Sequence, residues 1–380
     1  MMTTTSSPNA HLIGRPGSRH ALCTPVLLID LDAMERNIAA MAAFCRDHDV
    51  ALRPHAKTHK SVEIARRQRA AGAVGICVAT IGEAECLTAG GIDQLLITSP
   101  VSTAPKLARL TELHREADGL SVVVDSVDAV EALSALAGEV GKPLTVLVDL
   151  GIGLRRTGCA DNHAAMSVIT RITRANSLQF GGIQAYAGHL QHIANLSERQ
   201  RRDEDEGRAV DELCGQLEQA GIPVPKVTGA GTGTHAIDAA GGLFSELQCG
   251  SYIFMDADYS RIDLRGGKPP FEPALFVRTS VISANAQDHV TTDAGLKHFA
   301  TDCGVPTIMR GAPDCAVYAF FGDEHGRVNL KDAPDRLPLG TALECLTPHC
   351  DPTVNLHSVF HVISGDRLVD IWPIDARGAI

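Results

Sequence analysis

Apolar residues in this chain occur in short runs, and the segments between the runs have the spacing of amphipathic helices. After a first run at residues 26–29, eight more follow before about residue 256. Most are rich in leucine or β-branched residues without polar alternation, as expected of parallel strands covered on both faces. The eight runs are residues 50–52, 76–79, 95–98, 120–124, 144–148, 180–186, 226–227 and 246–248. The helical segments are residues 32–47, 61–71, 103–115, 127–137, 162–175 and 197–220.

Strands that alternate with helices form a parallel sheet with right-handed crossovers, and eight of them can close into a barrel. We therefore predict an α/β protein with a (β/α)8 barrel over residues 31–255. The run within residues 24–30 would be a ninth strand, so we expect it to lie outside the barrel.

The pattern changes after about residue 256, where helical periodicity fades and short strand-like runs are separated by glycine-rich turns. These runs are residues 275–284, 289–292, 307–309, 317–320, 342–345, 359–363 and 368–371. They predict a second, mostly antiparallel β domain made of residues 22–30 and 256–380.

The first residues of the chain are rich in serine and threonine and contain no apolar core, which excludes a secretory signal. Their lack of acidic residues would permit a transit peptide, but Pro8, Gly14, Pro16 and Gly17 interrupt any amphipathic helix. We expect residues 1–21 to be a disordered tail.

Composition narrows the class of protein. The 380 residues are 44% hydrophobic and 21% charged, with a net charge of -11, which excludes a disordered chain and argues against nucleic acid as a partner. No run of eighteen apolar residues occurs, so no membrane span is expected. The 11 cysteines are odd in number and lack CxxC spacing, and several lie singly in apolar segments. Reduced thiols in a cytoplasmic enzyme are therefore expected.

The first candidate for chemistry is Lys57, which directly follows the first barrel strand. Active sites of barrels lie at this carboxyl end of the strands. His55, His59 and Lys60 are close in sequence, and cationic neighbours lower the pKa of an amine, as a Schiff-base lysine requires. An ordinary exposed lysine is the alternative reading of this residue.

The second candidate is the small-residue loop at residues 227–234, which follows the seventh barrel strand. Small residues let backbone N–H groups approach an anion, and barrels often bind phosphate after strands seven and eight. The loop is neither a Walker loop nor a dinucleotide fingerprint, and a flexible surface loop is the alternative. A Schiff-base lysine and a phosphate loop on one barrel rim together indicate pyridoxal 5'-phosphate.

The third candidate is the pair His349 and Asp351, which is bounded by Pro348 and Pro352. Proline favours extended backbone before it, and alternate residues of an extended chain point the same way. The two side chains should therefore face one site, with Cys350 turned away. A histidine and a carboxylate suit a hard divalent cation such as Mn²⁺ or Mg²⁺. A proline-bounded surface turn is the alternative.

Several motifs in this order resemble the D-threonine aldolases, which belong with the D-serine dehydratases to the alanine-racemase-like fold. The similarity runs from about residue 22 to the carboxyl terminus. Its motifs are RPHAKTHK at 53–60, QAY at 184–186, GTGT at 231–234, ELQCGSYIFMD at 246–256, DAGLK at 293–297, DEHG at 323–326 and HCDPT at 349–353.

The resemblance implies roles for individual residues. Lys57 would bind the cofactor covalently, with His55 beside it as a second catalytic residue, and Arg156 would approach the ring hydroxyl. His349 and Asp351 would hold the cation. The other implied cofactor-binding residues are Tyr186, Gly231, Thr232, Gly233, Thr234, Gly250, Ser251 and Tyr252. Family members are homodimers that pair the β domain of one subunit with the barrel rim of the other.

The resemblance further implies cleavage of a D-3-hydroxy-amino acid, such as D-threonine, to glycine and an aldehyde. The main alternative is β-elimination by a D-serine or D-3-hydroxyaspartate dehydratase. In the dehydratases the second metal ligand is a cysteine two residues after the histidine, and here that position is Asp351, which favours the aldolase. An amino-acid racemase and a non-catalytic cofactor carrier are further alternatives, and the metal motif argues against both.

Overall fold

The structure is a computed structural model that describes residues 7–267, 269–330 and 336–380. Its contacts divide the chain into two compact units. The first unit contains residues 1–38, 251–261 and 270–377, and the second contains residues 39–250, 262–269 and 378–380. Among the described residues, none of the helices combines the length and the apolar character needed to span a bilayer.

The second unit is built on eight parallel strands, as the apolar runs predict. They are β2 (Ala51–Leu52), β3 (Ile76–Val78), β4 (Leu95–Ile97), β5 (Ser121–Val124), β6 (Leu144–Leu150), β7 (Leu178–Ala185), β8 (Val227–Gly229) and β9 (Glu246–Leu247). Their order is β2-β9-β8-β7-β6-β5-β4-β3, and a parallel bridge between His55 and Cys77 joins the two ends. The barrel interior includes the buried cluster of Cys77, Leu96, Val123 and Leu147.

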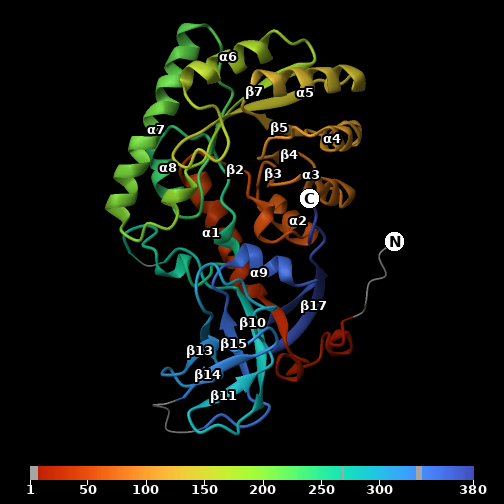
Figure 1. The fold of residues 1–380 in the computed structure, drawn as a ribbon, viewed down its shortest axis with the longest axis vertical. Coiled ribbons are helices and arrows are strands. Elements are labelled where there is room, and N and C mark those ends of the chain that lie inside the picture. Colours follow the sequence, from red (N-terminus) through yellow and green to blue (C-terminus); the bar gives the residue numbers. More distant parts are fainter. Residues whose placement is uncertain (1–6, 268, 331–335) are drawn as a thin grey trace. The chain divides into compact units, whose positions relative to one another are not determined.

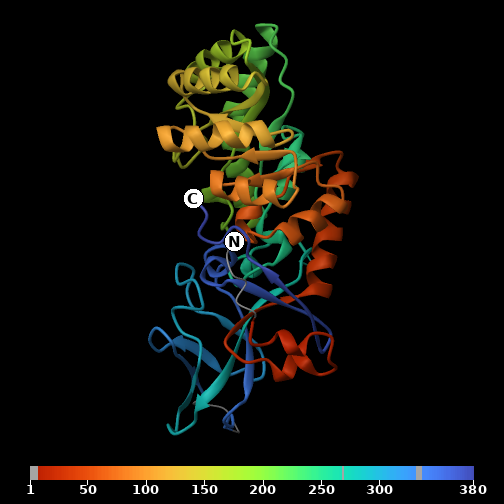
Figure 2. The same cartoon turned by 90° about the vertical axis from the view of Figure 1, so that its right-hand side faces the viewer.

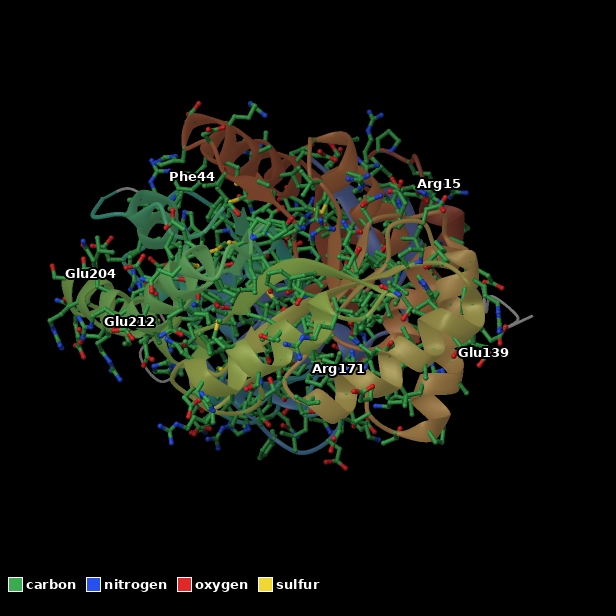
Figure 3. All side chains as sticks on the ribbon, turned by 90° about the horizontal axis from the view of Figure 1, so that it is seen from above. Arg15, Phe44, Glu139, Arg171, Glu204 and Glu212 are labelled. Carbon is green, nitrogen blue, oxygen red and sulfur yellow. The ribbon has the colours of Figure 1, made fainter. Side chains whose placement is uncertain are left out.

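Helices alternate with the strands, and Figures 1 and 2 show them as red to green coils. They are α1 (Leu31–Asp47), α2 (Val62–Ala70), α3 (Ile81–Ala89), α4 (Ala104–Glu116), α5 (Val127–Val140), α6 (Asn162–Thr173), α7 (Leu196–Gln219) and α8 (His235–Gly241). The charged outer faces of these helices carry ion pairs, and Figure 3 labels Arg171, which pairs with Glu131. Such exposed pairs contribute little to stability, so packing against the strands holds the helices in place.

The first unit contains the nine-stranded, mostly antiparallel sheet. Its strands are β1 (Val26–Asp30), β10 (Leu275–Ser283), β11 (His289–Thr292), β12 (Thr307–Arg310), β13 (Val317–Phe320), β14 (Gly326–Asn329), β15 (Ala342–Leu346), β16 (Val359–Ser364) and β17 (Arg367–Pro373). β1 pairs with β10 in antiparallel and with β16 in parallel orientation, so this early run does lie outside the barrel. The predicted fold class, a (β/α)8 barrel with a mostly antiparallel β domain, is confirmed.

The expected disordered tail is wrong for residues 7–21, while residues 1–6 lie outside the described residues. Short 3-10 helices form at Ala10–Leu12 and Ser18–Ala21. Leu12 is buried in a core cluster of this unit, and the Arg19 guanidinium donates to Glu344 Oε1 at 2.8 Å. Because the cluster includes Phe276 and Leu346 and the ion pair reaches Glu344, these contacts depend on residues far along the chain that local composition could not reveal.

Candidate active site

The loop after β2 fixes the position of Lys57. The short 3-10 helix Ala56–Thr58 carries it, and the His55 Nδ1 caps this helix by accepting the Lys57 backbone N–H at 3.3 Å. The His55 Nε2 lies 3.0 Å from Thr98 Oγ1, and the Thr98 hydroxyl donates to the Val78 carbonyl oxygen at 3.0 Å. Since the single hydroxyl proton is used there, Nε2 must donate to Thr98 and Nδ1 must be bare. His55 is therefore a neutral imidazole beside Lys57.

His59, the other histidine of the motif, has a structural role. It is buried, its Nδ1 accepts the Ser61 backbone N–H at 3.1 Å, and its Nε2 lies 3.2 Å from Gln68 Oε1. An imidazole that accepts at one nitrogen and donates at the other is neutral. His59 thus orders the start of α2 and adds no charge near Lys57.

Lys60 also differs from the sequence expectation. Its Nζ lies 2.6 Å from Glu83 Oε1, and both side chains are largely buried. The other oxygen, Glu83 Oε2, accepts the Ala79 backbone N–H at 2.7 Å. Lys60 is thus paired with Glu83, and the expected cationic surroundings of Lys57 stay a prediction. Its place at the carboxyl end of the strands is as predicted.

A buried hydrogen-bond network links the ends of the barrel strands, and sequence reasoning missed it. Gln184 Nε2 donates to Asp149 Oδ1 at 2.9 Å and to the Thr98 carbonyl oxygen at 3.1 Å. The Thr157 hydroxyl donates to Asp149 Oδ2 at 2.7 Å. Burial raises the pKa of Asp149, while the hydrogen bonds from Gln184 and Thr157 oppose that rise. In the sequence, these residues stand out only as polar side chains at or just after the ends of apolar runs, as Thr98, Asp149 and Gln184 do.

Two of the predicted cofactor-binding residues adjoin this network. Arg156 and Tyr186 line a small cavity of about 30 Å³ together with Asp149, Gln184 and Thr157. Arg156 is exposed and Tyr186 is half-buried. The structure therefore brings both residues to the carboxyl end of the barrel, at the ends of β6 and β7.

The predicted phosphate loop is compact and buried. Gly231 N donates to Thr234 Oγ1 at 3.2 Å, and Gly233 N donates to Gln191 Oε1 at 2.9 Å. Gln191 Nε2 also donates to Thr234 Oγ1 at 3.1 Å, so its side-chain amide bridges the loop. A Cβ at Gly233 would lie 2.3 Å from the Gln191 carbonyl oxygen, which explains the glycine. Sequence reasoning missed Gln191, and two N–H groups expected to face an anion are instead bonded within the protein.

Thr232 completes this loop through its backbone. The His235 Nδ1 lies 2.8 Å from the Thr232 carbonyl oxygen. Burial lowers the pKa of His235 to about 4, so its imidazole is neutral and Nδ1 carries the donated proton. The loop is thereby fixed to the first turn of α8.

Gly250 is the last residue of a segment of the second unit, and Ser251 and Tyr252 begin a segment of the first unit. A Cβ at Gly250 would lie 2.6 Å from Thr58 Oγ1, so the glycine permits close packing against the helix that carries Lys57. Ser251 begins the 3-10 helix Ser251–Ile253, and Tyr252 is fully buried with its ring 5.6 Å from that of Phe271. Tyr252 therefore packs in a core, and its cofactor contact stays a prediction.

The metal motif folds differently from the sequence expectation. His349 is extended and precedes α9 (Cys350–Leu356), so Asp351 lies in the first helical turn. Extended backbone through Asp351 is therefore wrong. Pro352 is tolerated because backbone N–H groups of a first turn need no helical partner. The Asp256 Oδ2 accepts the Cys350 backbone N–H at 3.0 Å and holds the start of the helix.

Two residues that the sequence did not single out lie beside His349. The His349 Nδ1 lies 2.6 Å from Asp302 Oδ2, and these groups and the Cys303 thiol all lie within 4.8 Å of one another. Burial and nearby carboxylates raise the pKa of Cys303 to about 11, so nitrogen and oxygen are the readier ligands here. Among the described residues, this is the group of three or more ligand side chains suited to a metal ion.

Comparison with known proteins agrees with this architecture. Residues 29–258 match the family model of the alanine racemase N-terminal domain, and residues 274–363 match that of the serine dehydratase domain. A D-threonine aldolase of an Arthrobacter species is 39% identical over 355 residues, which are 93% of each chain. A 3-hydroxy-D-aspartate aldolase of Paracoccus denitrificans is 37% identical over 361 residues, covering 93% of this chain and 92% of that one.

A solved structure gives the same result. The D-threonine aldolase of Filomicrobium marinum aligns with a TM-score of 0.89 and 37% identity, covering 95% of this chain and 97% of that one. A D-threo-3-hydroxyaspartate dehydratase of Delftia is more distant, at 31% identity over 92% of this chain and 97% of that one. Fold and site thus define a barrel enzyme of the alanine-racemase-like class. Within that class, the chain belongs to the D-threonine aldolase family.

Proposed function

We propose that this protein is a carbon–carbon lyase that cleaves D-3-hydroxy-amino acids of the D-threonine type to glycine and an aldehyde, with pyridoxal 5'-phosphate and a divalent cation. The observation that carries the proposal is Lys57, an amine at the carboxyl end of the barrel beside the neutral, hydrogen-bonded His55. Aldolase relatives at 37% and 39% identity, each matched over 93% of this chain, support the type of reaction.

The residues around Lys57 fit a pyridoxal phosphate cofactor. The buried Thr58 hydroxyl has no hydrogen-bond partner among the described residues, and Gly250 packs closely against it. Lys57 would bind the cofactor through Nζ, with Arg156 and Tyr186 at its ring and the 231–234 loop with Gly250 and Ser251 at its phosphate. The bound cofactor supplies an electron sink for the electrons released at the substrate's Cα.

The chain's own residues hold this site in one protonation state. His55 keeps its proton on Nε2 through Thr98 and orients the Lys57 backbone through Nδ1. Asp149 fixes Gln184 and Thr157, and Gln184 in turn fixes the Thr98 carbonyl group. These hydrogen bonds limit the motion of the His55 ring and of the Lys57 backbone.

The donor set at residues 349–351 fits a hard divalent cation. His349 and Asp351 would hold it, as the sequence motif suggests, and Asp302 offers a further carboxylate 2.6 Å from His349. We propose Mn²⁺ or Mg²⁺, because carboxylate oxygens prefer these ions and the Cys303 thiol is hard to ionise. Such an ion supplies a Lewis acid that lowers the pKa of a hydroxyl group.

Product analysis tests the proposed reaction. Purified protein with the cofactor and Mn²⁺ should convert D-threonine to glycine and acetaldehyde and leave L-threonine unchanged. Formation of 2-oxobutanoate and ammonia would instead identify the protein as a dehydratase. That second candidate is supported by the Delftia dehydratase relative, which is 31% identical over 92% of this chain.

We further propose a cytoplasmic homodimer. The 11 cysteines all lie in the described part of the chain and form no disulfide there, which is what a reducing compartment predicts. Several large apolar side chains of the β unit are exposed, among them Met309 at 47%, Val317 at 57% and Phe321 at 50%. Where such side chains form a contiguous patch, a second copy of the chain can cover it. Light scattering at assay concentration tests this point, and an active monomer would contradict it.

A further inference from the structure

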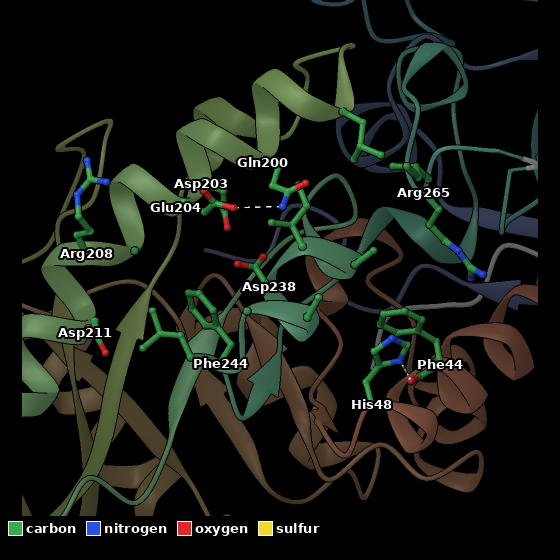
Figure 4. A pocket seen from close by; sticks show the side chains of 18 residues that line it. Phe44, His48, Gln200, Asp203, Glu204, Arg208, Asp211, Asp238, Phe244 and Arg265 are labelled. Atoms are coloured by element: carbon green, nitrogen blue, oxygen red, sulfur yellow. Dashed lines mark hydrogen bonds between the residues drawn. The ribbon is translucent and has the colours of Figure 1, made fainter.

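A cavity of about 750 Å³ lies within the barrel unit, away from Lys57. Helices α1, α7 and α8 and residues 264–265 form its walls, and Figure 4 shows the side chains that line it. Its volume is in the range of sites for small organic molecules. None of the residues assigned above to the cofactor or the metal lines it, so the proposed reaction leaves this cavity unexplained.

Two carboxyl groups meet in this cavity. Asp203 comes from α7 and Asp238 from α8, and Figure 4 shows both among the lining side chains. Asp238 is 4% exposed and hydrogen-bonds with Asp203 and Thr234, while its Oδ2 is buried with no hydrogen-bond partner assigned among the described residues. Burial raises the pKa of Asp238 well above its ordinary value, and the charge of Asp203 adds to that rise. Burying a polar oxygen without a donor costs about 1–3 kcal/mol, so the position favours a ligand that brings one.

The remaining lining determines which kind of ligand fits. It contains four carboxyl groups and two guanidinium groups. Both guanidinium groups already have contacts, because Arg208 pairs with Asp205 at 2.6 Å and Arg265 lies 5.9 Å from the ring centre of Phe44. The cavity therefore has an excess of hydrogen-bond acceptors with negative charge.

His48, whose ring stacks on that of Phe44 at 4.1 Å, and Gln200 are further polar members of the wall, and most of the rest is apolar. The larger apolar side chains are Phe44, Leu196, Ile237, Leu243, Phe244 and Leu264. Two aromatic rings among them can pack against an apolar body or attract a cation through their faces. A carboxyl pair next to aromatic rings is a combination that suits a molecule with one cationic and one apolar end.

We propose that this cavity is a second ligand site that binds an organic cation, with its N–H donors on Asp238 and Asp203 and its apolar part against Phe44 and Phe244. An amidinium or guanidinium group fits best, because its parallel N–H groups match carboxylate oxygens in pairs. A bound cation also removes the cost of ionising two carboxyl groups side by side. Lys57 does not line this cavity, and Asp238 also hydrogen-bonds with Thr234 of the 231–234 loop, so binding must be measured in the holoenzyme.

Benzamidine is a suitable probe because it is a planar cation on an apolar ring, and benzamide is its uncharged isostere. Titration calorimetry of the holoenzyme at pH 7.5 should detect one benzamidine site per chain, with benzamide at least tenfold weaker. Asp238→Asn should weaken benzamidine binding at least tenfold. Glu212→Gln makes the same change in charge at an exposed position of α7 outside the lining, labelled in Figure 3, and should change it less than twofold.

Several results would overturn the proposal. They are the absence of binding, equal affinity for benzamide, or equal loss in the Glu212→Gln variant. If D-threonine displaces benzamidine, the benzamidine site is at Lys57 and the proposal is wrong. If D-threonine does not displace it, the two sites are separate. Binding of Ca²⁺ in place of benzamidine would identify an inorganic cation site and refute the organic one. If Asp238→Asn does not fold, Asp203→Asn must show the same tenfold loss.

Discussion

The His55 Nε2 lies 3.0 Å from the Thr98 Oγ1, and this contact sets the tautomer of the imidazole next to Lys57. The Thr98 hydroxyl can accept from His55 because it donates its own proton to the Val78 carbonyl oxygen. Thr98, which follows β4, thereby sets the tautomer of His55, which follows β2.

Replacing Thr98 tests this control. Thr98→Val keeps the shape and removes the acceptor, which leaves the His55 N–H buried without a partner at a cost of about 1–3 kcal/mol. We expect kcat for D-threonine cleavage to fall roughly tenfold or more, with a smaller change in KM. Thr98→Ser should restore most of the activity. Equal activity of the Val and Ser variants would show that the hydroxyl has no role.

Lys57 is expected to be the covalent attachment point of the cofactor. Borohydride reduction and peptide mapping should place the pyridoxyl group on Lys57, and Lys57→Ala should lose the visible absorbance of the holoenzyme. Lys60→Met is the matched control, because Lys60 is held by Glu83 at 2.6 Å. It should lose stability and keep the absorbance band. A pyridoxyl group on Lys60 or Lys297 would refute the assignment.

The contact between Gln191 and Gly233 predicts how the 231–234 loop responds to substitution. Gly233→Val would place Cβ 2.3 Å from the Gln191 carbonyl oxygen, so the loop must shift and cofactor retention should weaken. Gln191→Leu removes the acceptor at 2.9 Å from Gly233 N and should also weaken retention, by roughly 1–3 kcal/mol. Cofactor dissociation constants measured by fluorescence decide the point. Unchanged constants in both variants would exclude the loop from cofactor binding.

We expect removal of the cation to stop catalysis and to leave the cofactor bound. A chelator should abolish turnover while the visible absorbance of the cofactor stays, and Mn²⁺ should restore activity. His349→Ala should lose bound metal as measured by elemental analysis. Asp351→Asn and Asp302→Asn, compared in the same assay, reveal which carboxylate is the second ligand. Asp351→Cys should shift the preference toward Zn²⁺, since a thiolate is the softer ligand. Full metal content in His349→Ala would refute the site.

The carboxyl pair at Asp203 and Asp238 predicts how stability depends on pH. Burial raises the pKa of Asp203 from 3.8 to about 6, so between these pH values the folded protein holds protons that the unfolded chain has released. The free energy of unfolding should therefore fall as pH rises through this window, by on the order of 1–3 kcal/mol. Urea unfolding of Asp203→Asn should have a flatter profile over this range than the wild type. An identical slope in the variant would assign the effect to other groups.

The barrel could be predicted from the sequence because its strands are buried on both faces. Burial on both faces requires apolar residues at consecutive positions, and these are visible as runs. β14 and α9 were harder to predict, because the local sequence at each favours another structure. β14 begins at Gly326, within a segment that reads as a turn, and Pro352 in the first turn of α9 reads as extended backbone. Local sequence describes what each residue favours, and a contact such as Cys350 N–H with Asp256 can reverse that preference.

The sequence by itself determined the two-part fold, the family and the residue types at the site, since Lys57, His349 and Asp351 stand out by type and spacing. Only the tertiary structure decided their surroundings: the neutral state of His55, the Gln191 bridge, Asp302 beside His349, and the pair of Asp203 and Asp238. These relationships join residues that lie far apart in the chain. Hydrogen bonding and charge act over a few ångströms in space, so they depend on packing that periodicity and spacing along the sequence do not specify.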